Sequence, residues 1–284
     1  MTGRPGPTRP IRVLELSGSV SRERRDDLAT EEPLEIRLTA PGGARKTVAI
    51  TMRTPGHDFE LAAGFLHGEG LVEPGGIAAI GYCVDEDLPS EARYNTVTVR
   101  LHGPIPDLPA LDRHFLTSSA CGVCGAASLD TLRDRCHPLP RGAVELSPDI
   151  LYGLPESLRK AQGVFGKTGG LHAAGLFTAE GELVAVREDV GRHNALDKLV
   201  GWSALNEALP LDRHVLMVSG RASYEIMQKA LAAGIAVVCA VSAPSSLAVD
   251  VARDFGMTLV GFLRGERCNV YAGHDRIVVD ADRL

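Results

Sequence analysis

The chain has 284 residues, of which 44% are hydrophobic and 23% are charged, and 36 acidic against 30 basic residues give it a net charge of −6. A chain of this length and composition can bury an apolar core without disulfide bonds, in one large domain or two ordinary ones. The negative charge argues against a general nucleic-acid binder, and no apolar run approaches the length of a membrane span.

The N-terminal segment contains no apolar core of the kind that secretion signals have. We therefore expect a cytoplasmic protein without membrane insertion, whose six cysteines are free thiols, ligands or catalysts rather than structural disulfides. Residues 1–10 hold three prolines and two glycines, and residues 22–27 are a dense charge run. Both features are typical of tails and exposed loops, so residues 1–30 are predicted to form a flexible tail.

The following segment, residues 31–140, is predicted to form a small α+β domain that ends in a cysteine-bearing loop. Strand-like runs at 34–39 and 47–51 precede Thr54 and Pro55, a pair typical of a helix N-cap with proline at the first helical position. Apolar residues then repeat at the spacing of one helical face, namely Phe59, Ala62, Ala63 and Leu66. This pattern predicts a helix that packs against the strands.

Two more strands are predicted at 77–84 and 96–101, and a short helix is predicted over 126–134. Between them lies a serine-rich loop with a CGVC motif. The best linker in the chain follows the helix, at Pro138, Pro140 and Gly142. We place the boundary between the two domains at this linker.

The second domain is predicted over residues 141–284. Two strands at 171–177 and 183–186 precede a helix over 192–205. Strands and helices then alternate, with strands at 215–218, 235–241 and 258–262 and helices at 223–233 and 246–255. Apolar strands that alternate with helices indicate right-handed crossovers and a largely parallel sheet, so the predicted fold class is α/β.

The strongest chemical signal is the pair Cys121 and Cys124 in the CGVC motif. Two thiols at this spacing can exchange a disulfide, bind a metal or pass sulfur between them, and the spacing itself favours a lowered thiol pKa. Zinc sites usually need a second such pair, which the sequence lacks, and dithiol oxidoreductases usually place the motif directly after a strand. Sulfur carriage is favoured mainly by the surroundings of the motif. A zinc site, a redox pair and two cysteines that only pack in a turn remain open as alternatives.

Small and polar residues follow three of the predicted strands. Ligands of open α/β sheets bind at the carboxyl ends of the strands, where helix N-termini and arginine side chains favour phosphate. The candidate binding residues are Ser219, Gly220, Arg221, Ser242, Pro244, Phe262, Leu263, Arg264, Gly265, Glu266 and Arg267. The alternative is that the serines only cap helices and that the arginines are solvated.

Zinc is not expected at these strand ends. Zinc deaminases carry HxE and PCxxC motifs at successive helix starts, and residues 192–194 and 219–222 contain neither. His172 and His193 lie beside small residues and are candidate polar groups of the site, although a structural role is the more common one for a histidine.

Several blocks of the sequence together resemble one family, the formate dehydrogenase accessory sulfurtransferases or FdhD family, over roughly residues 30–275. A CxxC motif alone is a weak pattern, whereas these blocks in this order are highly specific. The blocks are TP at 54–55, GFL at 64–66, EG at 69–70, TSSACGVCG at 117–125, GGLHAA at 169–174, EDVGRHNALDK at 188–198, SGR at 219–221, SAPSSLA at 242–248 and GFLRG at 261–265. One departure is Ala120, where the family pattern leads us to expect serine.

The resemblance implies a homodimer whose second domain has a fold akin to cytidine deaminase, in three layers and without its zinc. It also implies that persulfide sulfur passes from a cysteine desulfurase to the molybdenum cofactor Mo-bis(molybdopterin guanine dinucleotide), which the formate dehydrogenase apoenzyme requires. Cys121 matches the persulfide position and residues 262–267 match the cofactor-binding segment, with GDP as the expected mimic of the cofactor's nucleotide arm. The alternatives are a non-catalytic chaperone of the same cofactor and a dithiol oxidoreductase.

Overall fold

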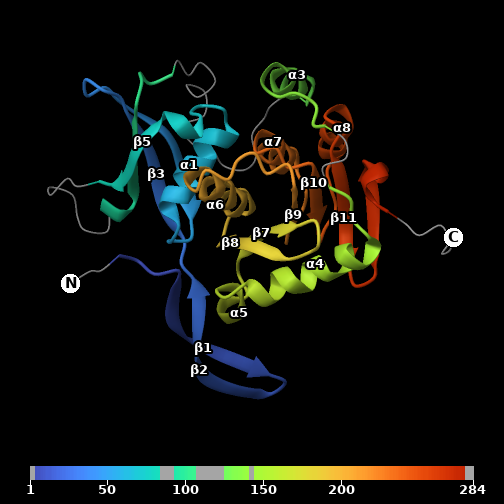
Figure 1. Cartoon of the computed structure of the whole chain (residues 1–284). Helices are drawn as coiled ribbons and strands as arrows, with labels where there is room; N and C mark the ends of the chain where they lie inside the picture. Colours follow the sequence, from blue (N-terminus) through green and yellow to red (C-terminus); the bar gives the residue numbers. More distant parts are fainter. Residues whose placement is uncertain (1–3, 84–92, 107–124, 141–143, 279–284) are drawn as a thin grey trace.

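The computed structural model describes residues 4–83, 93–106, 125–140 and 144–278. Within these ranges the strands form three sheets, of two, four and six strands (Figure 1). The strand order is β4-β3-β6-β5 in the four-stranded sheet and β12-β11-β10-β9-β7-β8 in the six-stranded sheet.

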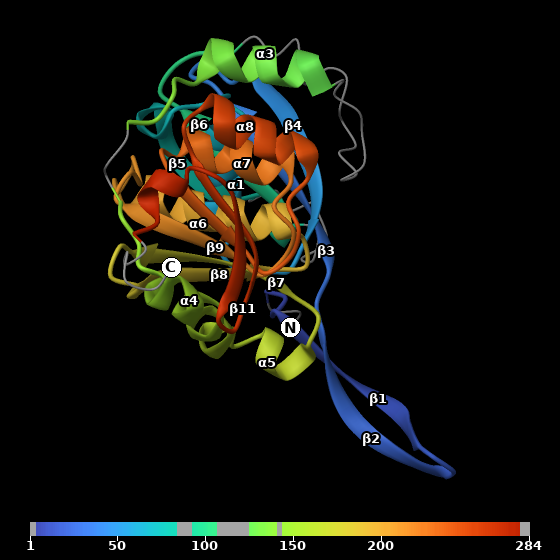
Figure 2. The same ribbon diagram turned by 90° about the vertical axis from the view of Figure 1, so that its right-hand side faces the viewer.

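The N-terminal segment forms a β-hairpin that projects from the body of the molecule (Figures 1 and 2). Its strands are β1 (Thr8–Ser17) and β2 (Val20–Ala29), paired in antiparallel fashion along their whole length. The loop predicted over residues 22–27 is therefore wrong, whereas the flexibility predicted for residues 1–30 stays a prediction. The charge run misled the prediction because both faces of an isolated ribbon are solvated, so charged residues fit a strand there as well as a loop.

The four-stranded sheet contains β3 (Glu32–Thr39), β4 (Arg45–Arg53), β5 (Ile77–Tyr82) and β6 (Thr96–Leu101). These strands confirm the four that the sequence predicted, and a short 3₁₀ turn η1 (Pro74–Gly76) precedes β5. Helix α1 (Asp58–Gly68) packs on the sheet and buries Ala62, Ala63 and Leu66. The predicted apolar face of the helix is thus confirmed, and Phe59, Ala62 and Leu66 share one core with β3 and β6.

Helix α1 does not begin where the sequence predicted. Its N-cap is His57, in the left-handed region at φ 57°, and Thr54 lies before the helix. Thr54 is buried instead, where its backbone N–H donates to Asp189 Oδ2 at 3.0 Å and its hydroxyl accepts from the N–H of Val190 at 3.2 Å. The threonine therefore ties the end of β4 to the end of β8 rather than capping the helix.

The six-stranded sheet is mixed rather than largely parallel. Its central strands β9 (His214–Val218), β10 (Val237–Ala240) and β11 (Thr258–Arg264) are parallel. Antiparallel strands flank them, namely β7 (His172–Thr178), β8 (Leu183–Asp189) and β12 (Arg267–Ala272). Strand β12 was not predicted, because residues 262–267 were expected to be a strand end, whereas they form a hairpin that turns at Gly265, with φ 53°.

Helices cover both faces of this sheet (Figures 1 and 2). One face packs against α6 (Arg192–Leu205), α7 (Tyr224–Ala232) and α8 (Ser246–Asp254), and the other against α4 (Pro148–Ala161). The short helix α5 (Phe165–Thr168) follows α4 and contacts β2 of the hairpin. Alternate strand residues serve the two cores: Leu216 and Val238 face α6–α8, whereas Val215 and Val237 face α4. Helix α3 (Gly125–Arg135) confirms the helix predicted after the CGVC motif, and η3 (His274–Arg276) lies near the C-terminus.

The two larger sheets are joined through a contact between the backbones of α1 and α6. A Cβ atom at Gly64 would lie 1.8 Å from the carbonyl oxygen of Asp197, and one at Gly201 would lie 1.8 Å from that of Glu60. Only glycine permits this approach. The predicted division at residue 140 remains a prediction, and so does the specific likeness to cytidine deaminase.

Candidate functional site

The predicted sulfur-carrying pair, Cys121 and Cys124, lies outside the described residues. The other four cysteines are described and have free thiols. Burial raises the pKa of Cys136, Cys239 and Cys268, so these thiols are poor sources of thiolate at neutral pH. Cys239 is fully buried, as expected of a core residue, whereas Cys83 is only half-buried.

The predicted strand ends come together at one edge of the six-stranded sheet. The N–H of Ser242 donates to the carbonyl of Gly220 at 3.3 Å, and the N–H of Phe262 donates to the carbonyl of Ser242 at 3.2 Å. Pro244 forms a bridge with Ala222, next to Arg221. The three segments 219–221, 242–244 and 262–267 are therefore neighbours, as the parallel strands β9, β10 and β11 require.

The residues of this edge differ in exposure. The exposed ones are Arg221, Phe262, Arg264, Gly265, Glu266 and Arg267. Leu263 is fully buried in the core beneath α4, so its side chain supports the sheet rather than facing the edge. Ser219 is half-buried and its hydroxyl accepts from the N–H of Ala173 at 2.9 Å, while Arg264 Nε donates to the carbonyl of Val241 at 3.1 Å.

A cavity of about 480 Å³ opens beside these strand ends, and we call it the edge cavity. Strand ends contribute His172, Ser219 and Val241 to its lining. The rest comes from the α4–α5 region: Pro155, Leu158, Arg159, Gln162, Phe165, Gly169, Gly170 and Leu171. The residues described as lining it include no carboxylate, which is notable in an acidic protein and favours a neutral or anionic ligand.

Basic groups gather beside the edge cavity. Burial lowers the pKa of His172, and so do the neighbouring Arg192, His193 and Arg221, while Asp189 opposes them. Arg192 is the first residue of α6, where the helix N-terminus adds partial positive charge. This clustering of positive charge around a sheet edge suits a phosphate-bearing ligand.

Helices α4 and α5, which contribute residues to the lining of the edge cavity, were not predicted from the sequence. Helix α4 contains Pro155. Its signals were nevertheless present: Ser147 caps the helix, Pro148 occupies the first turn, and Leu151, Leu154 and Leu158 form one buried face.

A second cavity, of about 380 Å³, lies between the four-stranded sheet and helices α6 and α7, and most of its charged side chains form ion pairs. Lys229 Nζ lies 2.8 Å from Asp197 Oδ1 and 3.2 Å from Glu69 Oε1, and His193 Nε2 lies 2.7 Å from Glu225 Oε2. Burial raises the pKa of Asp197 to about 6, and the two carboxylates raise that of Lys229, which therefore stays charged. These pairs join the end of α1 to α6 and α7, so the groups serve the contact between these helices.

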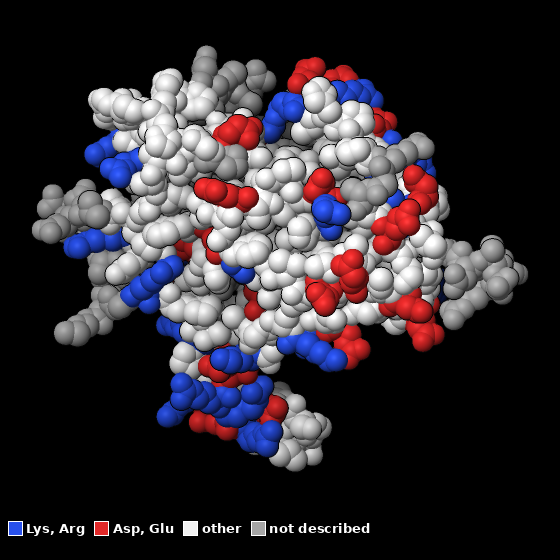
Figure 3. All heavy atoms as spheres, in the orientation of Figure 1, with Lys and Arg blue, Asp and Glu red and all other residues white. Residues whose placement is uncertain are grey.

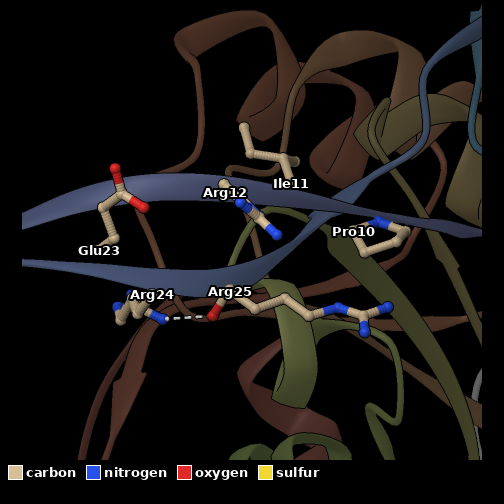
Figure 4. Close-up of a pocket in the computed structure, with 6 residues that line it drawn as sticks. All are labelled: Pro10, Ile11, Arg12, Glu23, Arg24 and Arg25. Atoms are coloured by element: carbon tan, nitrogen blue, oxygen red, sulfur yellow. Dashed lines mark hydrogen bonds between the residues drawn. The ribbon is translucent and has the colours of Figure 1, made fainter.

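The third cavity is an open groove of about 550 Å³ along the hairpin. Figure 4 shows its side chains projecting from the two strands, with Arg12 directly opposite Arg25 in the register. In Figure 3 basic and acidic atoms alternate over the same hairpin, at the bottom of the view. The groove is a charged surface rather than an enclosed site.

Two further findings concern metals and membranes. Within the described ranges, no three His, Cys, Asp or Glu side chains gather in a way that could hold a metal ion. The absence of zinc remains a prediction, because Cys121 and Cys124 lie outside those ranges. In the same part of the chain, no helix has the length and apolar character needed to cross a bilayer.

Comparison with known proteins bears on these features. The model of the FdhD/NarQ family matches residues 29–278. Proteins named sulfur carrier protein FdhD are similar to this chain along nearly their whole length. The one from Streptomyces coelicolor is 53% identical over 275 residues, which cover 95% of both chains. The one from Mycobacterium tuberculosis is 48% identical over 273 residues, which cover 94% of this chain and 97% of the other.

The fold also has a solved counterpart. A crystal structure described as that of a formate dehydrogenase accessory protein from Desulfotalea psychrophila covers 96% of this chain and 100% of its own, with a TM-score of 0.73 at 23% identity. This likeness supports the fold alone. The family match and the sequence identities confirm the resemblance that the motifs suggested: the chain belongs to the FdhD/NarQ family.

Proposed function

We propose that this protein carries sulfur as a persulfide on Cys121 and delivers it to a molybdenum cofactor that bears guanine dinucleotides, for use by formate dehydrogenase. The main support for this proposal is the pair Cys121 and Cys124, in a chain that matches a protein named sulfur carrier over 95% of its length. The raised pKa values of Cys136, Cys239 and Cys268 support this choice of thiols. The assignment of the persulfide to Cys121 rests on the family resemblance.

The chemistry is two thiol exchanges. The Cys121 thiolate attacks the outer sulfur of a desulfurase persulfide, the sulfur–sulfur bond of the donor breaks, and the donor leaves as a thiolate. For delivery, the Cys124 thiolate attacks Cys121 Sγ and expels the outer sulfur as hydrosulfide for the metal, which leaves a Cys121–Cys124 disulfide. A dithiol reductant then returns both cysteines to thiols.

The arginine-bearing sheet edge and the edge cavity are the proposed site for the nucleotide arm of the cofactor. GDP is the probe. Charge-assisted hydrogen bonds contribute about 1.5–3 kcal/mol each, so Arg264→Ala is expected to weaken GDP binding about tenfold or more. Titration calorimetry measures this, and unchanged affinity would remove Arg264 from the site.

The cysteine assignment has its own test. Cys121→Ala is expected to abolish formate dehydrogenase activity in complemented cells while GDP still binds, and Cys124→Ala is expected to reduce that activity while a persulfide still loads. Cys136→Ala is the matched control, since the pKa of its thiol is raised and full activity is expected. Normal activity with Cys121→Ala would refute the relay, and loss of loading in Cys124→Ala alone would reverse the two roles.

The same arginine-bearing edge also favours a second candidate, a cofactor chaperone that binds the nucleotide and carries no sulfur. Mass spectrometry after incubation with a cysteine desulfurase and cysteine separates the two. One added sulfur on the CGVC peptide supports the carrier, whereas GDP binding without added sulfur supports the chaperone. A disulfide as the sole product would favour a dithiol oxidoreductase. The proposal also includes a zinc-free homodimer in the cytoplasm, which light scattering, metal analysis and cell fractionation test.

A further inference from the structure

The hairpin of β1 and β2, which we call the arm, has two faces that differ in how their charges are arranged. Residues directly opposite one another in an antiparallel pair lie on the same face of the ribbon. On the first face, the carboxylate of Glu15 pairs with both Arg22 and Arg24. Arg24 Nη1 also lies 3.1 Å from Asp26 Oδ1. Except for Arg9, the charges of this first face are therefore neutralised within the arm.

The second face carries charges of both signs and does not pair them. The register places Arg12 opposite Arg25, and it places Glu23 and Asp27 on the same face. In Figure 4 the side chains of Arg12 and Arg25 extend in one direction, away from Glu23. Within the described ranges, none of these four side chains forms an ion pair or a hydrogen bond. Like charges directly opposite one another are unfavourable, so the second face lacks the counter-charges that a partner could supply.

The second face also exposes apolar side chains toward the tip of the arm. Leu14 is 62% exposed and Leu16 is 71% exposed, and both alternate with Arg12 along β1. The arm projects from the body, which α5 contacts at β2 (Figures 1 and 2). A two-stranded ribbon is marginally stable in water unless another layer covers it. The leucines and the unpaired charges together mark the second face as the one that another layer would cover.

The second face is complementary to itself. In a contact with two-fold symmetry the same surface of both copies is used, so the arginines of each copy can meet the carboxylates of the other. The leucines of the two copies then pack together between two layers about 10 Å apart. A nucleic acid or an anionic membrane would supply negative charge alone and would leave Glu23 and Asp27 unpaired. A second copy of the chain supplies both signs of charge and the apolar contact.

We propose that the arms of two copies pack face to face through this second face. Arg12 and Arg25 of each copy then pair with the two carboxylates of the other arm, and Leu14 and Leu16 leave the solvent. This inference rests on the proposed homodimer and adds to it the surface through which the copies associate.

Charge reversal tests the pairing, with sedimentation velocity over a concentration series as the measurement. One double variant, Arg12→Glu with Arg25→Glu, makes the second face wholly acidic, and another, Glu23→Lys with Asp27→Lys, makes it wholly basic. Each alone is expected to raise the dimer dissociation constant at least about tenfold, because like charges then meet. An equimolar mixture of the two is expected to form heterodimers of nearly wild-type affinity. Arg9→Glu is the control on the first face, where no change is expected.

The apolar contact has a separate variant. Leu14→Ser combined with Leu16→Ser is expected to weaken the dimer about tenfold, since two exposed leucines no longer become buried. Leu183→Ser is the control, because Leu183 is 37% exposed on β8, outside the arm, and no change is expected.

The outcomes separate the arm from the homodimer itself. A wild-type chain that stays monomeric would refute the proposed homodimer. A wild-type dimer whose dissociation constant is unchanged in the charge and leucine variants would overturn the role of the arm and leave the homodimer standing. Weakened charge variants whose mixture stays monomeric would overturn the pairing between arms.

Discussion

The two faces of the six-stranded sheet handle buried polar groups in opposite ways. On the α6–α8 face the buried charges are paired: Lys198 Nζ lies 2.6 Å from Asp189 Oδ2, and Lys229 Nζ lies 2.8 Å from Asp197 Oδ1. On the α4–α5 face, Gln162 keeps an unpaired amide beside a cavity. The first face therefore neutralises its buried charges in pairs, while the second leaves a buried donor unpaired near a cavity.

The largest expected effect on stability comes from Lys198→Met. Lys198 is 1% exposed and also donates to the carbonyl of Thr54 at 2.9 Å, so its loss leaves Asp189 as an unpaired buried charge. Breaking such a pair costs about 3–5 kcal/mol, which urea denaturation measures as the free energy of unfolding. Lys160→Met is the control, since Lys160 pairs with Glu156 on the surface and its loss is expected to change little. Equal losses of unfolding free energy in the two variants would show that the buried pair contributes no more than the surface pair.

A smaller loss is expected from Gly64→Ala. The added Cβ would lie 1.8 Å from the carbonyl oxygen of Asp197, so α1 and α6 must move apart, at about 1–3 kcal/mol for overpacking. Gly153→Ala is matched to it, because Gly153 also lies inside a helix but a Cβ there meets no described atom within 4 Å. That control is expected to be neutral or slightly stabilising. A neutral Gly64→Ala would show that the helices separate freely.

The α4–α5 face is expected to respond in the opposite direction. Gln162→Leu removes an unpaired buried donor and keeps the volume, so it is expected to stabilise the ligand-free protein by about 1 kcal/mol. The same urea measurement applies. A loss as large as that of Lys198→Met would mean that Gln162 serves the fold, and the contrast between the two faces would fail.

The smallest expected effect is on pH dependence. The pKa of His172 is lowered, mainly by burial, so between that lowered value and about 6.5 the unfolded chain holds a proton that the folded chain does not. Folded protein therefore loses stability as the pH falls through this window. We expect less than about 1 kcal/mol, because the imidazole is only half-buried. Unfolding at pH 7.5 and 5.5 measures it, and His172→Gln should lose less stability than the wild type does.

The sequence predicted the regular parts of the molecule well, for physical reasons. Helix α6 and strand β6 occupy the predicted residues because their apolar patterns and flanking turns are local signals. The convergence of Ser219, Ser242 and Phe262 followed from parallel pairing alone. Gln162 and Phe165 could not be placed in the same way, since the contact between α4 and the strand ends depends on the tertiary fold. The hairpin was missed because its charge run resembles a loop.

The projecting hairpin has a consequence for association between molecules. A two-stranded ribbon has two open edges, and rows of free backbone groups on such edges can pair with strands of other chains. Pro10 in β1 removes one donor, and charged side chains surround the remainder, including the arginines Arg9, Arg12, Arg22, Arg24 and Arg25. These features protect an ordered strand pair against edge-to-edge aggregation. The arm therefore presents mostly charged side chains to the solvent, together with the exposed Leu14 and Leu16.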